Sequence, residues 1–106
     1  MMFPSNLEVD EFKLILSLSS GWPREVEVLV YHKNCPEVLL GVSQTPKLTI
    51  KQDEGFVHEL QVYVSNKRHE VYLGDEAQRE FRKLWERAIE VALAKARENL
   101  AKLRSG

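Results

Sequence analysis

The chain has 106 residues, the size of one domain, and its hydrophobic content of 43% and charged content of 29% exclude disorder of the whole chain. A formal net charge of −1 excludes a global field that would attract DNA or an acidic membrane. The single cysteine, Cys35, excludes an intrachain disulfide, and no apolar run approaches the ~18 residues that would span a bilayer. We therefore expect one soluble, cytoplasmic domain over residues 1–106, with no membrane insertion.

The first ten residues contain Pro4 and acidic side chains but no apolar segment, so we expect an extended lead-in and not a secretory signal. From 11 to 73, apolar and polar residues alternate, and this period of two is typical of half-buried strands. The alternating runs are 11–18, 25–33, 37–42, 47–51, 57–65 and 69–73. Because only short breaker segments separate them, neighbouring strands are expected to pair antiparallel in a meander. The side chains expected on the inner face are Phe12, Leu14, Leu16, Leu18, Val26, Val28, Val30, His32, Val38, Leu40, Val42, Leu48, Ile50, His58, Leu60, Val62, Val64, Val71 and Leu73.

The last third of the chain predicts a long helix over about 75–103. Asp75 is a candidate N-cap, and Gln78 stands three residues later as in a capping box. The apolar stripe at helical spacing consists of Phe81, Leu84, Trp85, Ala88, Ile89, Ala92 and Leu93. The predicted fold class is therefore α+β: a twisted antiparallel sheet of about five to six strands, with one long C-terminal helix packed across its apolar face.

The length of this helix predicts that its C-terminal part packs against a second copy of the chain. At ~1.5 Å per residue it would extend roughly 45 Å, whereas a strand of five or six residues is only ~17–20 Å long. Past about Ala94 the stripe is interrupted by Lys95 and Asn99, so the tail either frays or packs on another copy. The residues predicted to form a homodimer interface are Leu93, Ala96, Leu100 and Leu103.

The outer face of the predicted sheet carries tyrosines among lysines. Flat rings on which bases stack, together with ammonium groups for phosphates, are what single-stranded nucleic acid requires. On this hypothesis the binding residues are Tyr31, Tyr63 and Tyr72 with Lys13, Lys33 and Lys51, and Lys67 and Arg68 extend the path. The alternative is an ordinary solvated face, because tyrosine is a good strand former and lysine keeps a sheet soluble. Four acidic residues that share the face favour this alternative: Glu25, Glu27, Glu59 and Glu70.

The loops at one end of the meander predict a basic rim. An up-and-down order brings the connections 19–24, 43–47 and 65–69 together. Arg24, Lys47, Lys67 and Arg68 would then surround Trp22, and such a rim could hold a phosphorylated headgroup, a nucleic-acid backbone or an acidic peptide. The alternative is that these are polar loop tips and that Trp22 covers the sheet edge.

Catalytic and metal-binding motifs are not found in the sequence. It contains no glycine-rich phosphate loop and no G-x-S-x-G. His32 and Cys35 have a ligand-like spacing, but a structural zinc site needs four ligands, and His58 and His69 would have to complete it from distant strands. We expect no enzyme activity, no cofactor and no metal.

The element order resembles two known groups. It is similar to single-strand nucleic-acid binders of the Whirly kind, in which a sheet carries aromatics and helices pack in dimers. It also resembles pleckstrin-homology-like domains, in which a meander ends in a helix bearing a tryptophan. Here Val71-Tyr72-Leu73 runs into 75–89 with Trp85, although the chain has one strand too few for that resemblance. The first resemblance implies binding of single-stranded DNA or RNA with little sequence preference, and the alternative function is a protein–protein interaction or adaptor module.

Overall fold

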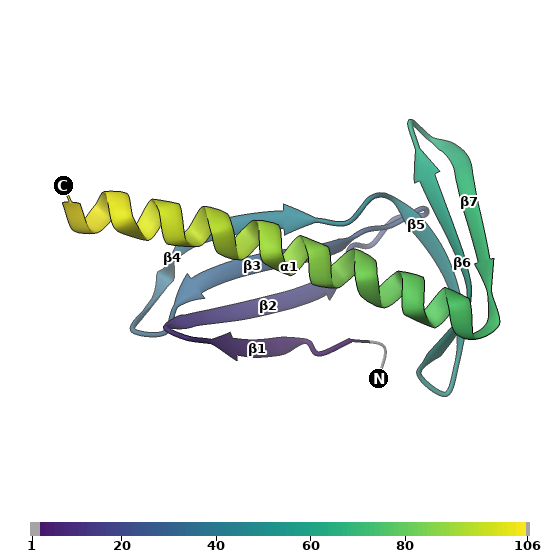
Figure 1. Ribbon diagram of the computed structural model, residues 1–106, viewed down its shortest axis with the longest axis horizontal. Coiled ribbons are helices and arrows are strands. Elements are labelled where there is room, and N and C mark those ends of the chain that lie inside the picture. Colours follow the sequence, from purple (N-terminus) through teal and green to yellow (C-terminus); the bar gives the residue numbers. More distant parts are fainter. Residues whose placement is uncertain (1–2, 106) are drawn as a thin grey trace.

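The structure, a computed structural model, describes residues 3–105 and consists of seven antiparallel strands followed by one long helix (Figure 1). The elements are β1 (Asn6–Val9), β2 (Phe12–Leu18), β3 (Val26–His32), β4 (Cys35–Gln44), β5 (Leu48–Asp53), β6 (Phe56–Val64), β7 (Lys67–Leu73) and α1 (Gly74–Ser105). The predicted α+β class, the antiparallel order and the C-terminal helix are confirmed.

The strands form two sheets, where one sheet of five to six strands was predicted. Sheet A has the order β1-β2-β3-β4 and sheet B has the order β5-β6-β7. The additional strand is β1, which lies in the predicted lead-in and turns Leu7 and Val9 towards the core.

The two sheets separate at Thr45, where the chain leaves β4. Thr45 is buried, and its Oγ1 accepts a hydrogen bond of 2.9 Å from the backbone N–H of Val26. Beyond it, Arg24 and Leu48 exchange two backbone hydrogen bonds of 2.9 and 2.7 Å. This isolated pair holds the start of sheet B against the segment that precedes β3.

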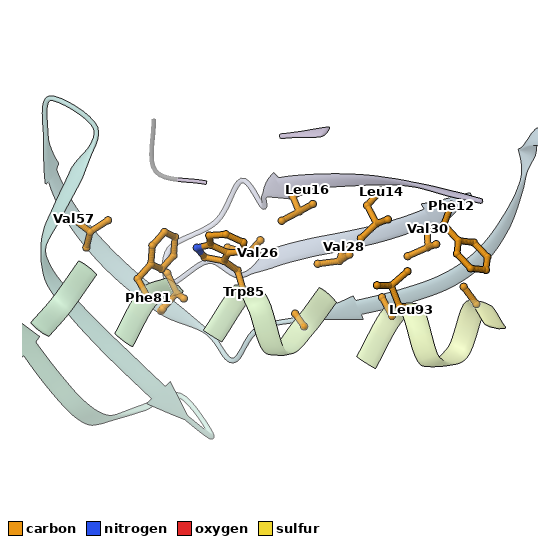
Figure 2. Packing of buried hydrophobic residues seen from close by; sticks show 14 of the residues in the cluster. Phe12, Leu14, Leu16, Val26, Val28, Val30, Val57, Phe81, Trp85 and Leu93 are labelled. Atoms are coloured by element: carbon orange, nitrogen blue, oxygen red, sulfur yellow. The ribbon is translucent and has the colours of Figure 1, made fainter. Parts of the chain in front are cut away.

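Helix α1 covers the inner faces of both sheets (Figure 1). Phe81 lies beside Val57 of sheet B, and Leu93 lies near Phe12 and Val30 of sheet A (Figure 2). Each such side chain, taken fully out of water, contributes about 1.5–3 kcal/mol to folding. The buried hydrophobic residues are Phe12, Leu14, Leu16, Val26, Val28, Val30, Leu40, Leu48, Val57, Leu60, Val62, Ala77, Phe81, Trp85, Ala88, Ala92, Leu93 and Ala96.

The second half of the helix is part of this core, which corrects the predicted dimer interface. Leu93 is 7% exposed and Ala96 is 0% exposed within the single chain, so neither side chain is available to another copy. A Cβ on Gly41 of β4 would overlap the backbone oxygen of Ala92, which shows how closely the strand and helix approach. The sequence argument failed because it compared the helix with one strand, whereas two sheets follow one another along a molecule 47 Å long.

Lys95 and Asn99, which interrupt the apolar stripe, cover the free edge of β4. The Lys95 ammonium donates to the carbonyl oxygen of Val42 at 3.2 Å, and the Asn99 amide donates to that of Leu40 at 2.7 Å. An edge strand otherwise presents unpaired carbonyls to any other chain. The helix therefore protects β4 with two side chains.

Register shifts in β4 and β6 change which side chains face the core. Val42 was predicted to face inward, yet it is 40% exposed, because shifts around Tyr31 turn the adjacent Leu40 and Gly41 towards the helix. Val38 is also 40% exposed, but it lies on the predicted side of the strand, with Leu40 and Leu100. His58, also predicted inward, is exposed, because the shift after Lys51 leaves it out of the β5–β6 pairing. A β-bulge reverses the alternation in this way.

Strand β7 also has its faces reversed. Tyr72 lies opposite Leu60 and packs against the core, whereas Val71 and Leu73, predicted inward, are 47% and 64% exposed. Val64, at the end of β6, is exposed as well. The shift between Val62 and Tyr63 accompanies this change.

The helix begins at Gly74 and does not form the predicted capping box. Gln78 accepts a hydrogen bond of 2.8 Å from the backbone N–H of Val57 and so connects the first turn of α1 to β6.

Candidate protein-binding face

The three tyrosines predicted to stack on bases do not share one face. Tyr31 lies on the outer face of sheet A, opposite Lys13, and Tyr63 lies on the outer face of sheet B. Tyr72 lies on the inner face of sheet B, against the core. The predicted aromatic platform is therefore divided between two sheets and two faces.

Two of the three lysines of that hypothesis are paired with carboxylates. Lys33 lies 3.5 Å from Glu8, and Lys51 lies 3.5 Å from Glu59. Lys13 remains on the outer face of sheet A with no ion pair within the described residues. Partial neutralisation of the lysines weakens the attraction that a phosphate backbone would meet.

The predicted basic rim assembles in part. The backbone N–H of Tyr63 donates a hydrogen bond of 2.8 Å to the carbonyl oxygen of Lys47, and Arg68 lies opposite Tyr63. These residues therefore gather at one end of sheet B. The Lys47 ammonium, however, lies 2.8 Å from a Glu25 carboxylate oxygen. Lys67 pairs with Val64 at the turn between β6 and β7.

Arg24 and Trp22 approach the rim from the other face. Arg24 pairs with Leu48, whose side chain is in the core, and directly opposed residues of an antiparallel pair share a face. The Arg24 guanidinium lies 5.6 Å from the centre of the Trp22 ring, and Trp22 is 67% exposed. The rim therefore divides between the two faces of sheet B.

The outer face of sheet A, turned away from the helix, is apolar where a solvated face is expected to be polar. Ile15 of β2, Leu29 of β3 and Val42 of β4 lie opposite one another in a row across three strands. In the next row, Tyr31 stands between Lys13 and Leu39. Ile15, Leu29 and Tyr31 are half-buried among their neighbours, while Leu39 is 48% exposed. We call these five apolar residues, Ile15, Leu29, Tyr31, Leu39 and Val42, the sheet A patch.

Charged residues stand on opposite sides of the row formed by Ile15, Leu29 and Val42. Lys13 lies in the row on one side of the Ile15–Leu29–Val42 row, and Glu27 lies in the row on the other side, between Ser17 and Gln44. Within the described chain, Glu27 and Lys13 form no ion pair. The row is therefore bordered by one free cation and one free anion.

The signal for most of this patch is present in the sequence. Ile15 and Leu29 occupy outward positions in the predicted strands, and an apolar residue at such a position breaks the expected alternation. Leu39 stands between Val38 and Leu40, which were predicted inward, and so carries the same signal, whereas Val42 was predicted inward and is turned outward by the register shift in β4.

A groove lies beside the patch, between β4 and the end of α1. Its volume is about 280 Å³, and Val38, Leu40, Leu100 and Leu103 line its apolar part. Of the predicted interface residues, Leu100 is partly buried here and Leu103 is 63% exposed. This end of the helix is the one part of the predicted dimer surface that is open to solvent.

The histidines and the cysteine do not converge. His32 and Cys35 are opposed in the β3–β4 pair, and His32 Nε2 lies 3.9 Å from a Glu11 oxygen that Arg104 also contacts at 3.1 Å. His58 and His69 lie in sheet B. Among residues 3–105, no three His, Cys, Asp or Glu side chains are grouped as metal ligands would be.

Within the described part of the chain, α1 is not apolar enough to cross a membrane.

The comparisons with known proteins give the following result for this chain. No protein-family model, no curated protein and no solved structure matches the chain.

Proposed function

We propose that the chain is a non-catalytic protein-interaction module that binds its partner through the outer face of sheet A. The observation that carries the proposal is the sheet A patch: five apolar side chains in two adjacent rows, on the face that the helix does not cover. Contiguous apolar surface on a folded chain commonly marks a binding site, because its removal from water contributes about 25 cal/mol per Å².

The chemistry around the patch favours protein over nucleic acid. Glu27 and Glu8 lie on the same face and would repel phosphate. Leu39 and Val42 offer aliphatic surface, on which bases do not stack as they do on aromatic rings. A protein surface with its own apolar residues fits both features.

Site-specific photo-crosslinking tests this function. A photoreactive amino acid at Leu39 is expected to form protein adducts in the cells that make the chain. The matched control is Val91 on α1, which is 42% exposed against 48% for Leu39. Equal labelling from both positions, or none from Leu39, would contradict the proposal.

Single-stranded nucleic acid, bound with little sequence preference, is a second candidate ligand. The observation in its favour is that Arg68 lies opposite Tyr63 on the outer face of sheet B. The backbone N–H of Tyr63 also donates a hydrogen bond to the carbonyl oxygen of Lys47, which brings Lys47 to the same end. Binding there should be strongest at low salt, near ~50 mM, because it releases counterions from the phosphate backbone.

Fluorescence anisotropy with a labelled oligonucleotide measures this second candidate. Tyr63→Ala should weaken binding far more than Arg82→Ala, whose guanidinium already lies 2.7 Å from Glu86 on the exposed side of α1. Absence of binding by the unsubstituted chain at low salt would exclude it.

A further inference from the structure

We infer that the partner of the sheet A patch is a second copy of this chain, packed face to face about a two-fold axis. This inference rests on the proposed function and names the partner for the same surface. It is argued from the symmetry of the patch, the charges that border it and the protection of the sheet edge.

The first argument is geometric. A two-fold dimer requires a surface that is complementary to itself. The row formed by Ile15, Leu29 and Val42 crosses three strands, and an axis that runs along this row, between the two sheets, places each residue over its own copy. Two sheets packed in this way lie ~10 Å apart, which is the distance that interdigitated aliphatic side chains fill.

The second argument is charge complementarity. Rotation about the row exchanges its two sides, so Lys13 of one copy moves to the side on which Glu27 of the other copy lies. Lys13 and Glu27 stand on neighbouring strands, β2 and β3, two residues before Ile15 and two residues before Leu29 respectively, and the strands are antiparallel. The dimer therefore gains two equivalent Lys13–Glu27 pairs, one on each side of the axis.

These two residues differ from the other charges on the sheets. Lys33, Lys47 and Lys51 each have a carboxylate partner within the chain. Lys13 lies opposite Glu8 of β1, whose carboxylate is 3.5 Å from Lys33, and neither Lys13 nor Glu27 forms an ion pair among residues 3–105. Each sits at the border of the apolar row. A second copy supplies the missing partner for both at once.

The third argument is that the edge of sheet A beside the patch is protected. Carbonyl oxygens of Leu40 and Val42 on β4 accept hydrogen bonds from Asn99 and Lys95, so another strand would have to displace these side chains before it could pair there. The open surface of this sheet is its face and not its β4 edge. Face-to-face packing uses that surface without disturbing the hydrogen bonds.

Sedimentation equilibrium of the purified chain, from micromolar to millimolar concentration, tests the inference with charge-reversal variants. The unsubstituted chain should shift from a mass of 12.3 kDa to twice that mass. Lys13→Glu and Glu27→Lys should each weaken dimerisation about tenfold, because each places two pairs of like charges across the interface. The double variant should recover to within about threefold, because the pairs form again with the signs exchanged.

Two controls separate this outcome from a loss of folding or from another interface. Arg87→Glu reverses an exposed charge on α1 and should leave the dimer unchanged. Circular dichroism of every variant should report the same helix and strand content. A dimer that ignores both reversals but dissociates on Leu103→Lys would place the contact at the end of α1 and overturn the inference.

The outcome for the proposed function is distinct. A chain that stays monomeric at every concentration overturns the second-copy inference, yet adducts with a different protein from Leu39 would still support the interaction module. A monomer that also forms no adducts from Leu39 contradicts both.

Discussion

The outer faces of sheets A and B differ in their central rows, although both sheets pack on the same helix. On sheet B the polar side chains bond to one another: Lys51 meets Glu59 at 3.5 Å, Gln61 donates to Glu59 at 3.3 Å, and Tyr63 donates to Gln61 at 3.1 Å. On sheet A the central row, Ile15, Leu29 and Val42, is apolar, whereas the exposed apolar side chains of sheet B, Val71 and Leu73, lie on its edge strand β7. A central row of hydrogen-bonded polar side chains needs no cover, whereas a central apolar row gains free energy when another surface covers it.

The largest expected effect concerns the helix that both sheets share. Phe81→Ala should lower the free energy of unfolding by about 3–5 kcal/mol, because a fully buried ring next to sheet B leaves a cavity. Urea denaturation measures the change. Phe56→Ala is the matched control: its ring is 67% exposed, so the loss should stay near ~0.5 kcal/mol. Equal losses would mean that α1 does not hold sheet B as described.

The corresponding test for sheet A is Gly41→Ala. The added methyl group would overlap the Ala92 carbonyl, so the strand and helix must move apart, at a cost of about 1–3 kcal/mol. Thermal unfolding, compared with Gly21→Ala, measures it. The nearest atom to a Cβ at Gly21 is 3.5 Å away, so that variant should be neutral or slightly stabilised. A neutral Gly41→Ala would show that sheet A is not held closely by the helix.

Removal of one tyrosine hydroxyl from each sheet compares how much the polar groups of the two outer faces contribute to stability. Tyr63→Phe should cost about 0.5–1.5 kcal/mol, because it removes the hydrogen bond to Gln61 on sheet B. Tyr31→Phe on sheet A should cost less than that, since its hydroxyl has no bond within the described residues. Denaturant titration of both variants under the same conditions decides; a larger loss for Tyr31 would reverse the contrast between the sheets.

The smallest expected effect on stability is accompanied by a change in association. Leu39→Thr should alter the free energy of unfolding by less than ~0.5 kcal/mol, because the side chain is 48% exposed, yet it should weaken binding at the sheet A patch. Leu73→Thr, on the outer face of sheet B and 64% exposed, should change neither quantity. Light scattering, together with thermal unfolding, measures both, and unchanged association of the Leu39 variant would count against the patch.

The sequence predicted most of the fold because alternation and helical period are local signals. Six of the strands and the helix lie close to their predicted positions, and the rows Phe12–Leu14–Leu16 and Val26–Val28–Val30 are buried as expected. Strand β1 was not predicted, because four residues between breakers show too few alternations. The division into two sheets depends on contacts such as Arg24 with Leu48, which are distant in sequence.

The site was less predictable because faces depend on register. One extra residue in β4 is enough to turn Val42 outward and Leu40 and Gly41 together inward, and composition carries no sign of it. Tyr72 lies against the core and not on the predicted nucleic-acid face, because it pairs with the buried Leu60. Ile15, Leu29, Tyr31 and Leu39 lie on the outer face, as the alternation in the predicted strands implies, and Val42 is the member of the patch that the pattern misplaces.

The two hydrogen bonds from α1 side chains to the edge of β4 bear on how the protein could aggregate. Lys95 and Asn99 donate hydrogen bonds to β4 carbonyls that an eighth strand would otherwise bind. Without the side chains of Lys95 and Asn99, the Leu40 and Val42 carbonyls would be open to another strand. Strand-by-strand growth from that edge would then compete with the ordered contact of two faces. The second half of the helix thus guards the β4 edge against uncontrolled strand addition.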